Sequence, residues 1–417
     1  MRLLLYELKK IRNPRVLLPI AALGLTAWFA LLGDFLSSYD SLLTHGIYGA
    51  YQTEMSARYG FTLEPEELAD FDIPAKKAAL VLEMDGIIAD SPVFARNAVR
   101  GFAAYEAYKN RDFEDYASEE ARAHGEALAE MEAVLEQRRD GMSLDEWYAS
   151  PLMRYRCLLA LERRYVGYDY EISEFVKFLD DRPVARASAE RIRKARNASL
   201  IPYFLCGDFA LYAAVTGAVA VFFTLLLVSP LVVADRQRHI HLLQYSSAAG
   251  RGVLRLQFIA IGLSALVFSL VCVCALYAPI LLGRAGSFWN APISAYDTGG
   301  TEGMQLYNLS FGQYVLLLAG ISVLFCVGAA CFAFVLARFS AGNITVLFIK
   351  AVPLGAAVVA LTVLTLKGAL TYSKTGAWNL LRGRFDLPEL WLCGLLAFAG
   401  VALAAWLVHR ERRVDVI

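Results

Sequence analysis

Long apolar runs separated by short polar segments fill most of the chain, and one long polar stretch follows the first run. A helix needs about 20 apolar residues to cross the roughly 30 Å hydrocarbon core of a bilayer. Lys350 is the main charge within the runs, and it lies near enough to the end of its run to reach the membrane surface. The pattern therefore predicts six transmembrane helices, over 16–33, 208–234, 258–282, 311–336, 344–366 and 390–408.

Basic residues divide the short polar segments into two groups. One group carries Arg2, Lys9, Lys10, Arg12, Arg15, Arg236, Arg238, Arg251, Arg255, Arg338, Arg410, Arg412 and Arg413. The other carries only Arg284, Lys367, Lys374, Arg382 and Arg384. Because basic loops stay in the cytoplasm, we expect cytoplasmic N- and C-termini, a cytoplasmic segment 235–257, a cytoplasmic loop 337–343 and a cytoplasmic tail 409–417. Segments 283–310 and 367–389 should then be extracellular.

The first 15 residues have the pattern of an amphipathic helix. Leu4, Leu5, Leu8 and Ile11 fall on one side of it, and the basic residues fall largely on the other. Such a helix lies in the plane of the membrane surface. We therefore expect residues 1–15 to form a cytoplasmic elbow that enters the first span, which GDFLSS follows in place of a signal-peptide cleavage site.

Residues 34–207 are expected to form an α-helical extracellular domain. Ser91 before Pro92 is a helix start, and Ser143 with Glu146 forms a capping box. A stripe at helical spacing, ended by Gly141, and a last helix over 185–198 complete the pattern; the stripe consists of Leu128, Met131, Val134 and Leu135. Between Ser37 and Asp208 the chain has 31 acidic and 21 basic residues, an excess that the solubility of an exposed domain explains and that would also attract cationic ligands.

Composition agrees with an all-α polytopic membrane protein. The chain has 417 residues, is 57% hydrophobic, has a mean hydropathy of +0.45 and carries no formal net charge. Five of the seven cysteines fall in predicted spans and have the pattern of packing residues. Cys157 and Cys206 both lie on the extracellular side. The sequence allows either a disulfide between them or two free thiols.

Motifs for catalysis and cofactor binding do not occur in the sequence. It has no GxxxxGK[ST] phosphate loop and no HExxH or CxxC pair. His239 and His241 are two residues apart, which would point their rings to different sides of a helix. We therefore expect a non-catalytic chain that binds no cofactor, metal or nucleic acid.

The segment 235–257 resembles the cytoplasmic loop of ABC-2 type transporter permeases. Together with Phe258 it reads DRQRHIHLLQYSSAAGRGVLRLQF. Those loops carry a glutamate, basic residues, a glycine, a leucine-rich turn, a hydroxyl residue and an arginine. Here Asp235 stands at the glutamate position and Arg251 at the arginine. Between them, Arg236 and Arg238, Leu243, and Ser246 with Ser247 match in register, whereas His239 replaces the glycine.

The resemblance implies a subunit that couples ATP hydrolysis on a separate ATPase to export. The contact with two ATPase copies, which would bind ATP and Mg, would be made by a coupling helix or loop that includes Asp235, Arg236, Arg238, His239, Ile240, Leu243, Tyr245, Ser246, Ser247, Arg251 and Arg255. It further implies a homo- or heterodimer in the bacterial cell membrane, in contact with lipid, and an amphipathic or hydrophobic substrate such as an antimicrobial peptide, drug or lipid.

Two further readings stay open. One is a membrane sensor or scaffold whose acidic extracellular domain binds a ligand, in signalling or peptide resistance. The other concerns hydroxyl residues in the spans, which could line a translocation path or simply bond back to their own helices: Thr26, Tyr212, Thr216, Thr224, Thr345 and Thr362. Segment 367–389 is expected to include a short extracellular helix, and both a re-entrant and a surface-bound form of it stay open.

Overall fold

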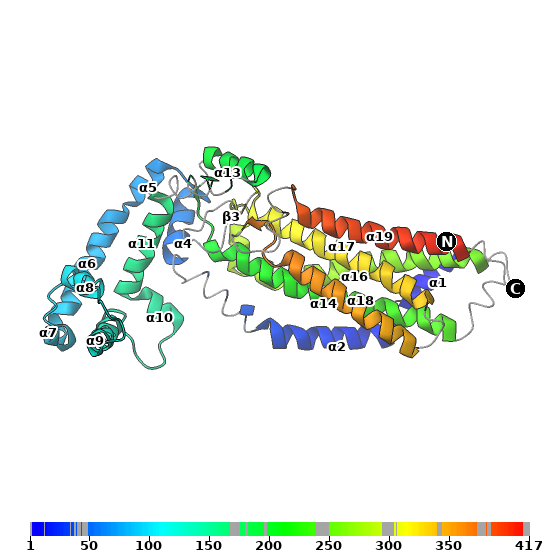
Figure 1. Cartoon of the computed structure of the whole chain (residues 1–417), viewed down its shortest axis with the longest axis horizontal. Helices are drawn as coiled ribbons and strands as arrows, with labels where there is room; N and C mark the ends of the chain where they lie inside the picture. Colours follow the sequence, from blue (N-terminus) through cyan, green and yellow to red (C-terminus); the bar gives the residue numbers. More distant parts are fainter. Residues whose placement is uncertain are drawn as a thin grey trace.

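Two parts make up the molecule, a helical bundle and a smaller helical domain at one end of it (Figure 1). The computed structural model describes residues 2–411 except 12, 34, 37–38, 40–42, 44–48, 167–172, 174–175, 178, 180–181, 196–197, 238–249, 294–303, 306, 340–343, 373–380 and 382–384. We call the end of the bundle that carries the domain the domain end, and the end where α14 stops and α16 starts the loop end.

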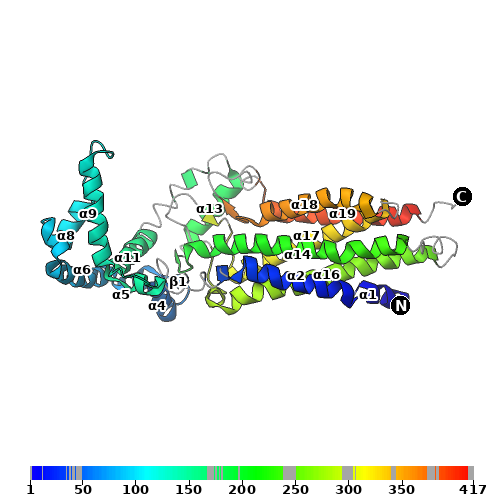
Figure 2. The ribbon, with the colours of Figure 1, turned by 90° about the horizontal axis from the view of Figure 1, so that it is seen from below.

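Six long apolar helices run along the bundle (Figure 2): α2 (Pro14–Leu31), α14 (Tyr203–Gln237), α16 (Gly250–Leu282), α17 (Phe311–Phe339), α18 (Ile344–Leu366) and α19 (Pro388–Glu411). Within the described residues, α14, α16, α17 and α19 are long and apolar enough to cross a membrane, and α2 and α18 contribute the shorter apolar stretches Pro14–Ala30 and Val352–Leu366. The chain therefore has the architecture of an all-helical membrane protein.

The ends of some bundle helices coincide with the ends of the apolar runs in the sequence. α18 has the predicted bounds, and α17 begins at the predicted residue. α16 instead begins eight residues before its apolar run, so Gly250 and Gly252, which the sequence favours for a turn, lie in its first turn. Leu254 in this extension is buried in a core shared with Ile11, and that packing stabilises helix beyond the apolar run.

α17 is the centre of the bundle, in contact with α14, α16, α18 and α19. α19 packs closely against it, because both helices carry small residues at the contact. A Cβ added to Gly400 would lie 3.1 Å from the Cβ of Cys331 and 3.1 Å from the carbonyl oxygen of Gly328. Such close backbone approach is how helices associate without a hydrophobic driving force in lipid.

The described residues of the helical domain form nine short and medium helices and two short strands: α4 (Gly49–Tyr59), α5 (Pro65–Phe71), α6 (Ile73–Asp90), α7 (Pro92–Arg96), α8 (Phe102–Lys109), α9 (Glu119–Leu135), α10 (Leu144–Ala149), α11 (Pro151–Val166), α13 (Pro183–Ala195) and the strand pair β1 (Thr62–Leu63) and β2 (Ala198–Ser199). A separate core holds it together, with Met55, Met84, Tyr105 and Met131 fully buried.

Capping signals in the sequence set several of these helices. The Ser143–Glu146 capping box is confirmed at the start of α10, and its hydrogen bond from the Ser143 amide lowers the pKa of the Glu146 carboxyl. Ser91 precedes Pro92 at the start of α7 as expected. The predicted end of α9 at Gly141 is wrong, since α9 stops at Leu135 and Gln137 takes a positive φ of 51°.

Contacts at the domain end join the two parts. The Ser199 hydroxyl in β2 donates to the carbonyl of Pro292, in the segment that follows α16, and Phe61 packs against Phe288 of the 3-10 helix η1 (Arg284–Phe288). Beside them, β3 (Met304–Gln305) pairs with β4 (Thr371–Tyr372). The re-entrant helix expected near Trp378 lies outside the described residues.

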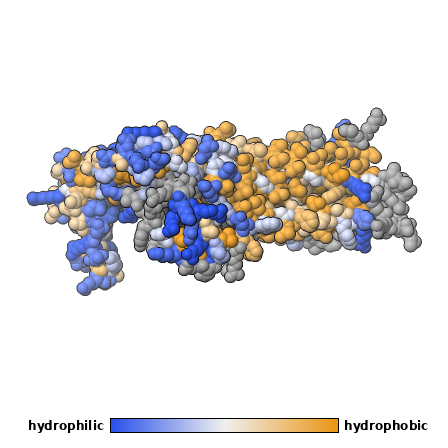
Figure 3. All heavy atoms as spheres, turned by 90° about the horizontal axis from the view of Figure 1, so that it is seen from above, coloured by the Kyte–Doolittle hydropathy of each residue, from blue (hydrophilic) through white to orange (hydrophobic). Residues whose placement is uncertain are grey.

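Surface hydropathy follows this division. In Figure 3 the bundle is covered by hydrophobic residues and the helical domain is mostly hydrophilic. On α19, Trp391 is 69% exposed and Trp406 is 53% exposed, and 15 residues separate them. Tryptophan is enriched at both membrane surfaces, so these side chains suit the two boundaries of a membrane-embedded bundle.

Candidate functional site

The described residues of the sequence-predicted coupling segment 235–257, which are 235–237 and 250–257, are at the loop end of the bundle. Asp235 and Arg236 are in the last turns of α14, Arg251 is in the first turn of α16, and Arg255 is exposed one turn later. The residues between these helices lie outside the described part of the chain: Arg238, His239, Ile240, Leu243, Tyr245, Ser246 and Ser247. Because α14 and α16 pack together, both ends of the segment are held at one site.

α1 (Arg2–Ile11) packs against the helices that flank this site. It ends before Asn13, which is the N-cap residue of α2. In Figure 1, α1 turns away from α2 toward α16 and α14. Leu4, Leu8 and Ile11 pack into the core that includes Leu254. Leu5, expected on the same face, is instead 61% exposed. The stripe of α1 that packs against the bundle is therefore narrower than its stripe of apolar residues.

A buried ion pair fixes the same end of the bundle. Arg338 in the last turn of α17 is 5% exposed, and its Nη2 lies 2.6 Å from a carboxylate oxygen of Glu411, the last residue of α19. Nearby on α19, the Arg410 guanidinium lies 5.5 Å from the ring centre of Trp406. Arg338 is therefore neutralised by Glu411, whereas Arg410 is exposed at the same end of the bundle.

The hydroxyl residues proposed for a translocation path fall in two different environments. Thr216, Thr224 and Thr362 are completely buried, and each hydroxyl donates to a carbonyl of its own helix, at 2.8, 2.8 and 2.7 Å. Thr26 also bonds back to its helix, at 3.0 Å from the Ala22 oxygen, but faces outward. The side chain of Thr345, in the first turn of α18, is outside the described residues.

The buried residues Tyr212, Tyr277 and Phe209 form an aromatic cluster. Tyr212 donates its hydroxyl to the carbonyl of Leu276 on α16. The Tyr277 ring lies 6.3 Å from the Tyr212 ring and 5.3 Å from Phe209. Within the described residues the Tyr277 hydroxyl has no hydrogen-bond partner, which is costly for a buried polar atom.

Three helices meet beside this cluster at Gly217. A Cβ added there would lie 2.7 Å from Leu366 Cδ1 and 3.2 Å from the Ser322 hydroxyl oxygen, so a larger residue would require the side chains of α17 and α18 to shift. Tyr277, Ser322 and Gly217 were missed from sequence, because each is an ordinary residue within its own helix. Only the packing of separate helices brings them together.

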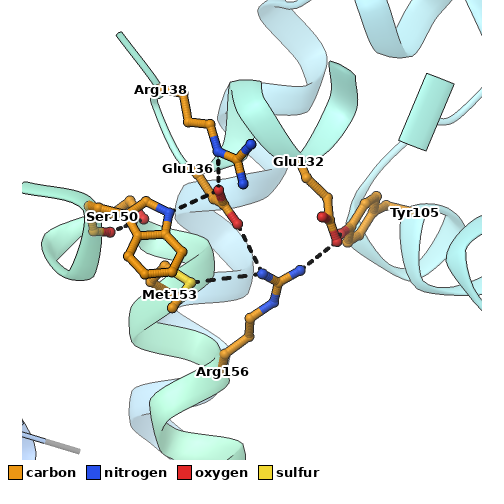
Figure 4. A network of polar contacts seen from close by, with 8 residues as sticks. Tyr105, Glu132, Glu136, Arg138, Ser150, Met153 and Arg156 are labelled. Carbon is orange, nitrogen blue, oxygen red and sulfur yellow. Dashed lines mark hydrogen bonds and ion pairs between the residues drawn. The ribbon is translucent and has the colours of Figure 1, made fainter. Parts of the chain in front are cut away.

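A charged network at the centre of the helical domain was also missed (Figure 4). Glu136 is completely buried and accepts from Arg156 Nη1 at 2.9 Å, Arg138 Nε at 2.6 Å and Trp147 Nε1 at 2.9 Å. Arg156 also donates to Glu132 at 2.5 Å, and Glu132 accepts from the Tyr105 hydroxyl. Burial and then the Glu132 charge raise the pKa of Tyr105 well above its ordinary value, so this hydroxyl stays a donor.

The two cysteines that were open to a disulfide are free and belong to different cores. Cys157 is buried in α11 of the helical domain, where burial raises the pKa of its thiol to about 12. Cys206 is buried in α14 within the bundle. The two thiols therefore act as small packing groups.

The described residues contain no group of three or more His, Cys, Asp or Glu side chains that could hold a metal ion. Comparison of the chain with protein-family models, with curated proteins and with solved structures found no match.

Proposed function

We propose that the chain is the permease subunit of an ABC-2 type transporter, working with a separate ATPase to export an amphipathic or hydrophobic substrate. The observation that supports the proposal is the position of the two helices that flank the segment 235–257, whose sequence resembles the coupling loop of that family. Its two ends, Asp235 and Arg251, are held by the packed helices α14 and α16 at the end of the bundle opposite the helical domain.

In this proposal α2, α14, α16, α17, α18 and α19 are six spans in the bacterial cell membrane, both termini are cytoplasmic and the helical domain is extracellular. ATP and Mg bind the partner ATPase, of which two copies serve a permease dimer. Closure of the ATPases would press on the coupling segments and tilt α14 and α16, a rigid-body transition of packed helices.

Orientation is tested first, by the labelling of single cysteines in intact cells. In a variant that lacks the seven native cysteines, Glu126→Cys places a thiol on an exposed site of α9, and Ser246→Cys places one in the coupling segment. A membrane-impermeant maleimide should label the first in intact cells and the second only after lysis. The reverse pattern would contradict the proposed orientation.

Coupling is tested by co-purification with the partner ATPase that this proposal requires. Leu243→Asp and Arg251→Glu should each reduce assembly and ATP turnover, because they place acidic charge in the proposed contact. Arg122→Glu is the matched control, since Arg122 is 78% exposed on α9 in the helical domain. Unchanged assembly and turnover in both coupling variants would overturn the proposal.

A second candidate is a membrane sensor or scaffold, and the helical domain favours it. This domain has its own core, and residues 49–166 carry 23 acidic and 14 basic side chains. Such a domain would attract a cationic peptide by long-range fields. ATP turnover that responds to added peptides, drugs or lipids supports transport, whereas binding of a cationic peptide without any change in turnover supports the sensor.

A further inference from the structure

α13 is a basic, amphipathic helix in an otherwise acidic domain. Its sequence, PVARASAERIRKA, has four basic residues and one acidic residue. By contrast, the domain from 49 to 166 has 23 acidic against 14 basic residues. The charge of α13 is therefore opposite to that of the domain to which it belongs.

One face of α13 is fixed against the protein. Ser188, Ala189 and Ile192 are at most 3% exposed, and their spacing of one, three and four residues places them on one side of the helix. This face holds α13 in place. The basic residues occupy the remaining surface, where they are available to an external partner.

The basic side chains of α13 differ in whether they have ion-pair or hydrogen-bond partners within the protein. Arg186 pairs with Glu190, and Arg191 donates to the carbonyl of Ala187 and the hydroxyl of Ser188. Arg193 and Lys194, in the last turn, are exposed and have no ion pair with any described residue. Cations at a helix C-terminus are locally favourable, but neither side chain has an anionic partner within the described chain.

Position then indicates the partner. In Figure 1 α13 lies at the junction of the domain and the bundle, and β2, which follows it, contacts the segment after α16 through Ser199. Figure 3 views the side of the molecule that carries α13, and there the hydrophilic surface gives way to the hydrophobic surface of the bundle. A basic helix beside such a boundary is at the level of the lipid headgroups.

We propose that the exposed face of α13 docks onto the phosphate groups of anionic lipids in the leaflet nearest the helical domain. Its charge complements an anionic headgroup, and its surface continues into the hydrophobic surface that lipid tails cover. The acidic remainder of the domain would be repelled by the same headgroups, so α13 determines which part of the domain faces the membrane. This inference is independent of the proposed transport function, because it requires only a membrane-embedded bundle.

The test uses the full chain in lipid nanodiscs and measures hydrogen exchange of the backbone amides of residues 183–195. With phosphatidylglycerol present, exchange should be about tenfold slower than in discs of phosphatidylcholine alone, since each basic residue near an anionic surface contributes several-fold to the docked population. The double variant Arg193→Gln/Lys194→Gln should exchange at nearly the same rate in both kinds of disc. Equal wild-type rates in the two discs would overturn the proposal.

A matched control changes the same amount of charge far from the membrane. Arg96→Gln/Arg122→Gln alters two exposed arginines of α7 and α9, 67% and 78% exposed, and should keep the wild-type lipid response. A response lost in this control would show a general charge effect and contradict the proposal. Equal exchange of the α13 double variant and wild type in phosphatidylcholine discs checks that α13 still folds.

A final arm separates lipid from free phosphate. Glycerol phosphate added to phosphatidylcholine discs presents the same anionic group without a membrane anchor. Slower exchange in phosphatidylglycerol discs alone supports docking to lipid. Equal slowing by glycerol phosphate would show a site for soluble anions and overturn the proposal in its lipid form.

Discussion

The Arg338 guanidinium makes a two-pronged contact with the Glu411 carboxylate, its Nε lying 2.9 and 2.7 Å from the two oxygens. The pair ties the last turn of α17 to the last residue of α19 at the loop end. Removal of Arg338 takes away the cation that neutralises the Glu411 carboxylate, whose side chain is only 15% exposed. We therefore expect Arg338→Met to destabilise the bundle by roughly 3 kcal/mol, measured as a fall in Tm in detergent.

Arg410→Met is the control for this change, because Arg410 is exposed at the same end of α19 and lies over the Trp406 ring. Its effect should be below about 1 kcal/mol. A Tm for Arg338→Met as high as that of Arg410→Met would show that the ion pair contributes little to stability.

The close approach of α17 and α19 predicts a second effect. Gly400→Val would force its side chain against Cys331 and the Gly328 carbonyl, at a cost of about 1–3 kcal/mol. Gly394→Val in the same helix is matched to it, since a Cβ at Gly394 meets no atom within 4 Å. Thermal unfolding should separate the two variants, and similar Tm values would contradict the packing described for Gly400.

The charged network of the helical domain predicts a third effect. Arg156→Met leaves the buried carboxylate of Glu136 without its cation on that side and should destabilise the domain by roughly 3 kcal/mol. Arg122→Met removes an exposed arginine whose Glu126 partner is 3.8 Å away, so it should cost less than about 0.5 kcal/mol. Chemical unfolding monitored by Trp147 fluorescence tests the difference; an intact transition in Arg156→Met would count against the network.

His124 predicts a pH dependence. Its ring lies 4.2 Å from Tyr108 and 4.9 Å from Phe113, and burial, followed by the Arg111 charge, lowers its pKa below 6.5, although Glu120 opposes this. The unfolded chain therefore binds the proton more readily, so this contribution to stability is present above pH 6.5 and is lost as the pH falls. Tm measured above and below that pH should fall less in His124→Phe than in wild type. An equal fall would exclude His124 as the cause.

Much of the bundle could be predicted from sequence, because a long apolar run forms a helix with nearly the same bounds as the run. α18 shows this, with its expected bounds of Ile344 and Leu366. α14 extends past its run because Leu205 packs in the bundle core at the domain end. Local chemistry likewise predicted the Ser143 capping box.

Tertiary contacts decided what the sequence could not show. α9 stops before Gly141 because Glu136 is drawn into the network with Arg156, and that contact joins residues 20 positions apart. The approach of Ser322 to Gly217 depends on three helices at once. Patterns along one helix carry no information about such neighbours.

The unbroken length of α14 has a mechanical consequence. Its 35 residues extend about 52 Å at 1.5 Å per residue, so one helix reaches from the domain junction to the coupling segment. Near its middle, at Gly217, it packs against side chains of α17 and α18. If α14 tilted as a rigid rod about this point, Gln237 and Tyr203 would move in opposite directions, and Tyr203 would move by about two thirds of the displacement at Gln237.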